Sequence, residues 1–93
     1  MNEITLFDPN GNPCAYIDTN DMTIFLWSGE PVAYLQNENI YGFNGNHLGW
    51  FEDGILWDHN GTKVGYTRNT LRVYANYEPY KSYKQYIPYK CKW

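Results

Sequence analysis

The sequence lacks long hydrophobic runs, has very little cysteine and shows no helical periodicity. No stretch approaches the roughly 20 apolar residues of a membrane-spanning helix, and residues 1–5 lack the basic and apolar regions of a signal peptide. Two cysteines, Cys14 and Cys91, are too few for a disulfide framework. We therefore expect a cytoplasmic protein with no membrane partner, and whether Cys14 and Cys91 pair stays open.

The usual motifs of enzyme chemistry are also missing. There is no Gly-rich phosphate loop, nucleophile elbow or zinc pattern. His47 and His59 have no cysteine or carboxylate at metal-ligand spacing. Glu52, Asp53 and Asp58 cluster in the sequence, and two carboxylates can catalyse glycoside hydrolysis, but Asp53 precedes a glycine in a turn signal. We predict no enzyme activity, no catalytic residue, no metal site and no cofactor.

Aromatic residues are what the sequence has in abundance. Its 93 residues include ten Tyr, four Trp and four Phe, which bury large areas in a domain with little interior. Charge divides the chain, because residues 1–76 carry nine acids and three bases while residues 77–93 carry one acid and four lysines. We expect a repeat domain over 1–76 and a separate tail over 77–93. The acidic body makes a nucleic-acid partner unlikely.

One hairpin pattern occurs four times. Each copy has a turn glycine, and these are Gly11, Gly29, Gly45 and Gly61. Five and four positions earlier stand an aliphatic and an aromatic residue: Leu6-Phe7, Ile24-Phe25, Ile40-Tyr41 and Leu56-Trp57. Three to five positions later stand a mid-sized apolar, a tiny and a large aromatic residue: Cys14-Ala15-Tyr16, Val32-Ala33-Tyr34, Leu48-Gly49-Trp50 and Val64-Gly65-Tyr66. A repeat this regular predicts four copies of one structural unit.

The turn residues predict the register of each hairpin. Asn-Gly or Ser-Gly between apolar runs favours a two-residue type I′ turn, which needs positive φ at both positions. That register would place Phe7 opposite Cys14 and would put the aliphatic residues opposite the tiny ones. The strands expected are 3–7, 13–18, 22–27, 31–36, 40–43, 47–52, 55–59 and 63–67.

Four equal hairpins predict an all-β fold arranged about a pseudo-four-fold axis, like a propeller or flower. The tiny residues would converge near the axis, where backbones leave no room for side chains. Residues 70–75 have strand composition and would lie beside the first strand to close the ring. The alternative architecture is an eight-stranded meander rolled into a barrel.

The third and fourth copies carry a family resemblance. The third contains Gly-Trp-Phe-Glu-Asp-Gly at 49–54, and the fourth contains Asp-His-Asn-Gly at 58–61. With these motifs the chain resembles the bacterial 4-fold beta flower domain family over roughly residues 4–68. The resemblance implies a compact all-β domain of four petals and implies no activity.

The tail has its own spacing. Five tyrosines recur every three residues: Tyr77, Tyr80, Tyr83, Tyr86 and Tyr89. With Pro79 and Pro88 among them, this period suits polyproline II, which has three residues per turn. The tyrosine stripe would dock on the aromatic body, or the tail would be a free recognition arm, or residues 80–87 would form a short helix.

Two non-catalytic function classes remain open, ahead of an enzyme as the third. The first is a non-catalytic protein-interaction or scaffolding module that binds a protein partner through the tail. The second is a carbohydrate-binding module that uses an exposed aromatic face, with these residues as the ligand-binding candidates: Tyr16, Tyr34, Trp50 and Tyr66. The sequence assigns neither the ligand nor the oligomeric state.

Overall fold

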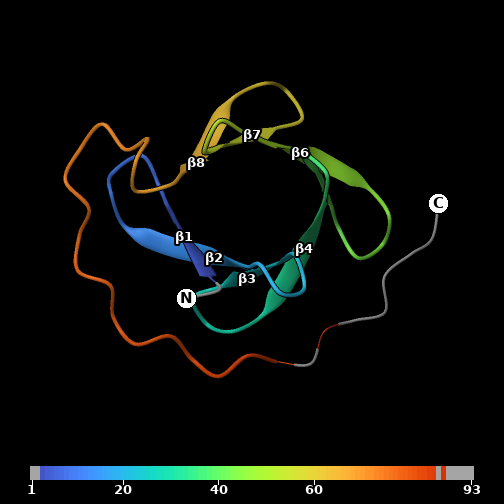
Figure 1. Cartoon of the computed structure of the whole chain (residues 1–93), viewed down its shortest axis with the longest axis horizontal. Coiled ribbons are helices and arrows are strands. Elements are labelled where there is room, and N and C mark those ends of the chain that lie inside the picture. Colours follow the sequence, from blue (N-terminus) through green and yellow to red (C-terminus); the bar gives the residue numbers. More distant parts are fainter. Residues whose placement is uncertain (1–2, 86, 88–93) are drawn as a thin grey trace.

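Eight antiparallel strands form a closed barrel in which every strand pairs with its neighbours in sequence (Figure 1). The computed structural model describes residues 3–85 and 87. The strands are β1 (Glu3–Phe7), β2 (Pro13–Asp18), β3 (Thr23–Leu26), β4 (Pro31–Gln36), β5 (Asn39–Tyr41), β6 (His47–Glu52), β7 (Ile55–Asp58) and β8 (Lys63–Tyr66). The all-β prediction is confirmed. The four hairpins stand around one axis. Their strands pair into the eight-stranded barrel, which was the alternative architecture.

The barrel interior is filled by aliphatic side chains and tiny residues. Alternation along each strand sends one set of side chains inward and the other outward. The buried inner cluster comprises Leu6, Ala15, Ile17, Ile24, Ala33, Leu35 and Ile40. Leu6, Ile24, Ile40 and Leu56 lie opposite Ala15, Ala33, Gly49 and Gly65, as the repeat predicts. All four tiny residues are buried.

The turns differ from the type I′ prediction. In the first hairpin the Gly11 N–H donates to the Asp8 carbonyl at 3.0 Å, and the Asp8 N–H donates to the Asn12 carbonyl at 2.9 Å. Among the residues of this loop only Gly11 has positive φ, at 86°. The loop therefore has three residues, a type I turn followed by a left-handed glycine. The same two bonds recur in the other three hairpins.

This loop displaces the register by one residue. Phe7 pairs with Pro13 rather than with Cys14, and a bulge lies between this pair and the Leu6–Ala15 pair. The other three hairpins have the same irregularity. The bulge adds a residue on one strand, and in each hairpin that residue lines the barrel mouth: Cys14, Val32, Leu48 and Val64.

The ring closes without the segment that we expected to close it. Residues 70–75 form no strand, and β8 itself pairs with β1 through Phe7 and Tyr66. From Leu71 the chain instead runs along the outside of the barrel, past β1 and on toward β3 (Figure 1). We call residues 71–85 the strap. The described residues contain no helix that could span a membrane.

Candidate functional site

Aromatic pairs line the outer wall of the barrel where adjacent hairpins meet. Each pair joins neighbouring strands in direct register: Tyr16–Phe25, Tyr34–Tyr41, Trp50–Trp57 and Tyr66–Phe7. The four candidate ligand-binding aromatics therefore point outward from β2, β4, β6 and β8, in different directions around the barrel. Tyr16 and Tyr34 are only 1% and 4% exposed, while Trp50 and Tyr66 are half-buried.

Two lysines attach the strap to the junction of β2 and β3. The Lys81 ammonium lies 4.9 Å from the ring centres of both Tyr16 and Trp27. Lys84 lies 5.8 Å from the Tyr16 centre and 5.5 Å from that of Phe25. Each contact is within cation–π range. The tail therefore binds the body through cations on aromatic faces.

Carboxylates complete this lysine site. Lys81 pairs with Glu3 at 2.9 Å, and Lys84 pairs with Asp18 at 2.5 Å and with Glu3 at 3.3 Å. The hydrogen bond from Lys81 lowers the pKa of Glu3, and the bond from Lys84 lowers the pKa of Asp18. The bond to Asp18 raises the pKa of Lys84. Burial raises the pKa of the Tyr16 phenol between them. All four groups keep their usual charge at neutral pH.

Backbone hydrogen bonds fix the strap at two turn glycines. The Asn76 N–H donates to the Gly11 carbonyl at 2.8 Å, and the Gln85 N–H donates to the Gly29 carbonyl at 2.9 Å. A Cβ added to Gly29 would lie 2.0 Å from the Tyr83 carbonyl oxygen. The strap backbone therefore approaches these turns more closely than any side chain at the glycine would allow.

A further hydrogen-bonded pair lies between these two turns. The Ser82 N–H donates to the Trp27 carbonyl at 3.1 Å, and the Trp27 indole N–H donates to the Pro79 carbonyl at 3.0 Å. The strap is therefore bonded to the body on both sides of its lysines.

The tyrosines of the strap face the solvent, which corrects the prediction that they dock. Tyr77, Tyr80 and Tyr83 are 84–99% exposed, and Tyr74 joins them at 97%. The tail does fold back over its described residues, but lysine and backbone make the contacts. Tyr86 and Tyr89 lie outside the described residues, as does any pairing of Cys91 with Cys14. No helix occurs in the described part of 80–87.

The sequence contains a second repeat that relates to this docking, in addition to the three-residue spacing of the tyrosines. Residues 73–81 and 82–90 form a nine-residue repeat, with Tyr, Pro and Lys at matching places. In the structure, Asn76 and Gln85 hold equivalent positions of the two units and bond equivalent glycines. Each nine-residue unit of the strap therefore spans the distance from one hairpin turn to the next.

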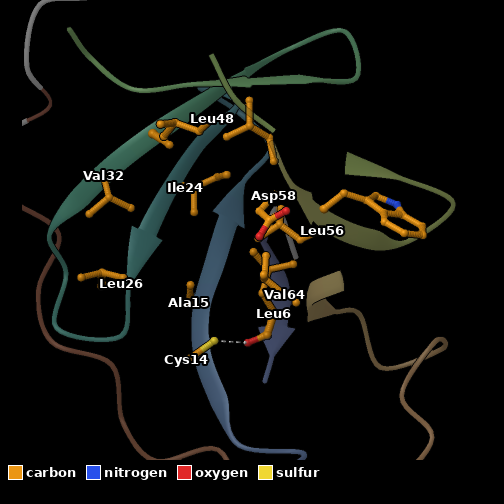
Figure 2. Close-up of a pocket in the computed structure, with 14 residues that line it drawn as sticks. Leu6, Cys14, Ala15, Ile24, Leu26, Val32, Leu48, Leu56, Asp58 and Val64 are labelled. Carbon is orange, nitrogen blue, oxygen red and sulfur yellow. Dashed lines mark hydrogen bonds between the residues drawn. The ribbon is translucent and has the colours of Figure 1, made fainter. Parts of the chain in front are cut away.

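The barrel mouth is a second candidate site. It opens into an apolar cavity of about 240 Å³ (Figure 2). The four bulge residues share its wall with Leu6, Ala15, Ile24, Leu26, Ala33, Ile40, Leu56, Trp57, Asp58 and Gly65. Burial raises the pKa of the Cys14 thiol, and a thiol is nucleophilic only as thiolate. The cavity can exclude water around a small apolar group, but its lining offers no activated nucleophile.

The remaining polar candidates lie apart from that cavity, except Asp58. The Asp58 carboxylate accepts from the backbone N–H groups of Asn60 and Thr62 at 2.9 Å each, which is turn chemistry. Glu52 and Asp53 are exposed. The rings of His47 and His59 lie 5.0 Å apart beside Trp50, and these three rings contact one another. Sequence spacing alone does not predict that the two histidines meet.

Comparison with known families agrees with this architecture. A family model of the 4-fold beta flower protein matches residues 4–92, and the chain belongs to this family. The match extends beyond the barrel through the strap. No curated protein and no solved structure matches the chain.

Proposed function

We propose that this member of the 4-fold beta flower family is a non-catalytic, cytoplasmic protein-interaction module whose contact surface is the tyrosine stripe of its strap. The stripe consists of Tyr74, Tyr77, Tyr80 and Tyr83. One observation carries the proposal: these side chains are 84–99% exposed on a backbone that is bonded to a rigid barrel. Large exposed aromatic patches mark interaction sites on soluble proteins.

The chemistry of the stripe favours a protein partner. Tyrosine supplies a large contact area at low cost in side-chain entropy, and it is enriched at protein interfaces. Apart from the exposed Arg72, the charged residues of the strap have partners within the chain, since Lys81 and Lys84 pair with the barrel and Glu78 pairs with Arg68. What the strap offers a partner is therefore aromatic rather than cationic.

Carbohydrate binding is the weaker candidate. A sugar-binding platform needs several exposed rings on one face. Tyr16 and Tyr34 are almost fully buried, and the aromatic pairs point away from the barrel in different directions. No observation on the outer wall favours this alternative.

The proposal is tested by site-specific cross-linking in the native host. A photoreactive residue replaces Tyr80 on the stripe or, as a control, exposed Asn69 off it. We expect a protein adduct from position 80 alone, and its loss when the other three tyrosines become serine. Because these tyrosines stand clear of the barrel, the serine variant should melt at the parental temperature. A lowered melting temperature would show that the tyrosines are structural, and the absence of an adduct would reject the stripe as a contact surface.

A further inference from the structure

The four hairpin junctions share a set of positions that determines whether a cation binds there. Seven residues after the turn glycine, on the outer wall, stand Asp18, Gln36, Glu52 and Arg68. Two residues before the glycine stand Pro9, Trp27, Phe43 and His59. The β2–β3 junction therefore combines the Tyr16–Phe25 pair with Trp27 and an acid. The β6–β7 junction combines the Trp50–Trp57 pair with His59 and an acid.

Three junctions already hold a cation from the chain itself, and one of these cations is Lys63 on the Trp57 ring at β6–β7. At β2–β3 it is Lys81 with Lys84, which lie on the rings and pair with Glu3 and Asp18. At β8–β1 it is Arg68, whose guanidinium lies 5.0 Å from the centre of the Phe7 ring. At this junction Arg68 itself occupies the position equivalent to Asp18, so that a cation replaces the acid. The outer aromatic pairs are therefore cation sites wherever the local charge permits.

The β6–β7 junction has the aromatic rings and the acid, but no described cation lies on Trp50. Glu52 is exposed and forms no ion pair with the described residues. Lys63 lies 5.5 Å from the Trp57 centre, on the other ring of the pair. Trp50 and Trp57 are half-buried and His59 is exposed, whereas Tyr16 and Phe25 under the strap are each 1% exposed.

The described residues also leave the turn beside this junction uncovered. A Cβ at Gly61 would meet nothing within 4 Å, whereas at Gly29 it would meet the backbone of the strap. Both glycines have the same loop and nearly the same φ, 82° and 90°. The Gly61 carbonyl therefore occupies the position that accepts the strap N–H at Gly11 and Gly29.

We propose that the β6–β7 junction binds an extended, lysine-bearing segment of a partner protein in the way that β2–β3 binds the strap. The ammonium of the incoming lysine lies on Trp50 and pairs with Glu52. A backbone N–H of the segment donates to the Gly61 carbonyl. This site is separate from the tyrosine stripe and does not depend on the function proposed for it.

One side chain moves when the segment binds. At β2–β3 the rings of Tyr16 and Trp27 meet at 87°, which leaves a corner for Lys81. At β6–β7 the rings of Trp50 and His59 are stacked at 5° with centres 5.7 Å apart, so that the corner is closed. Because His59 is exposed on a turn, it has room to rotate off Trp50, with the loss of its ring contacts to Trp50 and His47. The resonances of His59 therefore report binding.

The test uses a synthetic nonapeptide with the sequence of residues 77–85, which contains both docking lysines. It is titrated into the full-length chain and followed by NMR. We expect saturable shifts at the Trp50 indole and the His59 ring, with the Trp27 indole unchanged. A peptide with glutamine at both lysine positions should bind about 2- to 30-fold more weakly, as expected for loss of a cation–π contact.

Matched charge-reversal variants test whether Glu52 is the acid that pairs with the incoming lysine. Glu52→Lys should weaken peptide binding several-fold, while Glu30→Lys, an exposed acid beside the Gly29 turn, should not. Neither change touches the barrel interior, so both variants should keep the parental fold. Equal binding by the two peptides, equal binding by the two variants, or shifts confined to Trp27 would each overturn the proposal. Shifts at Trp27 would mean that the peptide only displaces the strap.

Discussion

The strap-covered side of the barrel and the open side are built from the same repeat but have different surfaces. On β1–β4, the outward rings of Phe7, Tyr16 and Phe25 are at most 1% exposed. On β6–β8, the equivalent rings Trp50, Trp57 and Tyr66 are only half-buried. The backbone and register are alike in both regions, and at Tyr16 and Phe25 the strap lysines cover the rings. The hairpin repeat thus determines the barrel, and the docked strap determines which of the hairpin junctions remain open to a partner.

The inner wall gives the largest expected effect in this comparison. At the positions where the strap-covered side has Ala15 and Ala33, the open side has glycine, and a Cβ at Gly49 would lie 1.9 Å from the Trp57 carbonyl oxygen. Gly49→Ala should therefore cost about 3 kcal/mol of unfolding free energy, at the upper end for overpacking. Denaturant unfolding measures it. Gly65→Ala is the control, because its Cβ would meet only the Leu56 side chain at 3.1 Å. Equal costs would contradict this account of the wall.

Removal of the two strap lysines should remove the difference in aromatic exposure between the strap-covered side and the open side. Replacing Lys81 and Lys84 by glutamine abolishes the cation–π contacts and leaves Glu3 and Asp18 without their ion pairs. We expect a loss of about 2 kcal/mol and increased solvent exposure of Trp27. Fluorescence quenching measures the exposure. Lys63→Gln, which removes the cation–π contact with Trp57, should have a much smaller effect. A double variant with unchanged quenching would show that the lysines do not hold the strap.

The docking should fail in acid before the barrel unfolds. The pKa values of Glu3 and Asp18 are lower in the folded state, so their contribution is complete above their unfolded values, near pH 4, and is lost as the pH falls through the lowered values. Lys84 has a raised pKa, so its contribution is lost only as the pH rises through that value, above about 10. The Trp27 indole proton shift, followed against pH, should move below about pH 4 while strand resonances stay.

The control for this titration is a variant without the two carboxylates. Glu3→Gln combined with Asp18→Asn should weaken docking at neutral pH and remove the acid transition of Trp27. If the transition persists in this variant, other groups cause it.

The strands and the inner wall of the barrel could be predicted closely from sequence, whereas its closure by β8 and the course of the strap could not. Tiny residues opposite aliphatic ones identify the inner wall, because a residue on this wall has to match its neighbour in size. The predicted loop type was wrong because an Asn-Gly pair fits both the two-residue and the three-residue loop. The Asp8 carboxylate, which accepts from the N–H groups of Asn10 and Asn12 at 2.9 Å, favours the longer one.

The direction of the strap side chains depends on the tertiary structure. A three-residue period places tyrosines on one side and leaves other residues for the opposite side, but it does not say which side faces the body. That choice depends on Asp18, which follows Tyr16 on β2, and on Glu3, which joins it only once β1 pairs with β2. The pairing of the strap lysines with this junction is therefore a property of the fold and not of the local sequence.

The most direct test of the strap's role compares two turn glycines by hydrogen exchange. The backbone strain of a non-glycine residue at positive φ should cost about 1 kcal/mol in both Gly29→Ala and Gly61→Ala. Only at Gly29 would the added Cβ strike the strap. The Gln85 amide should be protected in the parent and in Gly61→Ala, and should exchange freely in Gly29→Ala. Free exchange in the parent, or protection in both variants, would contradict the account.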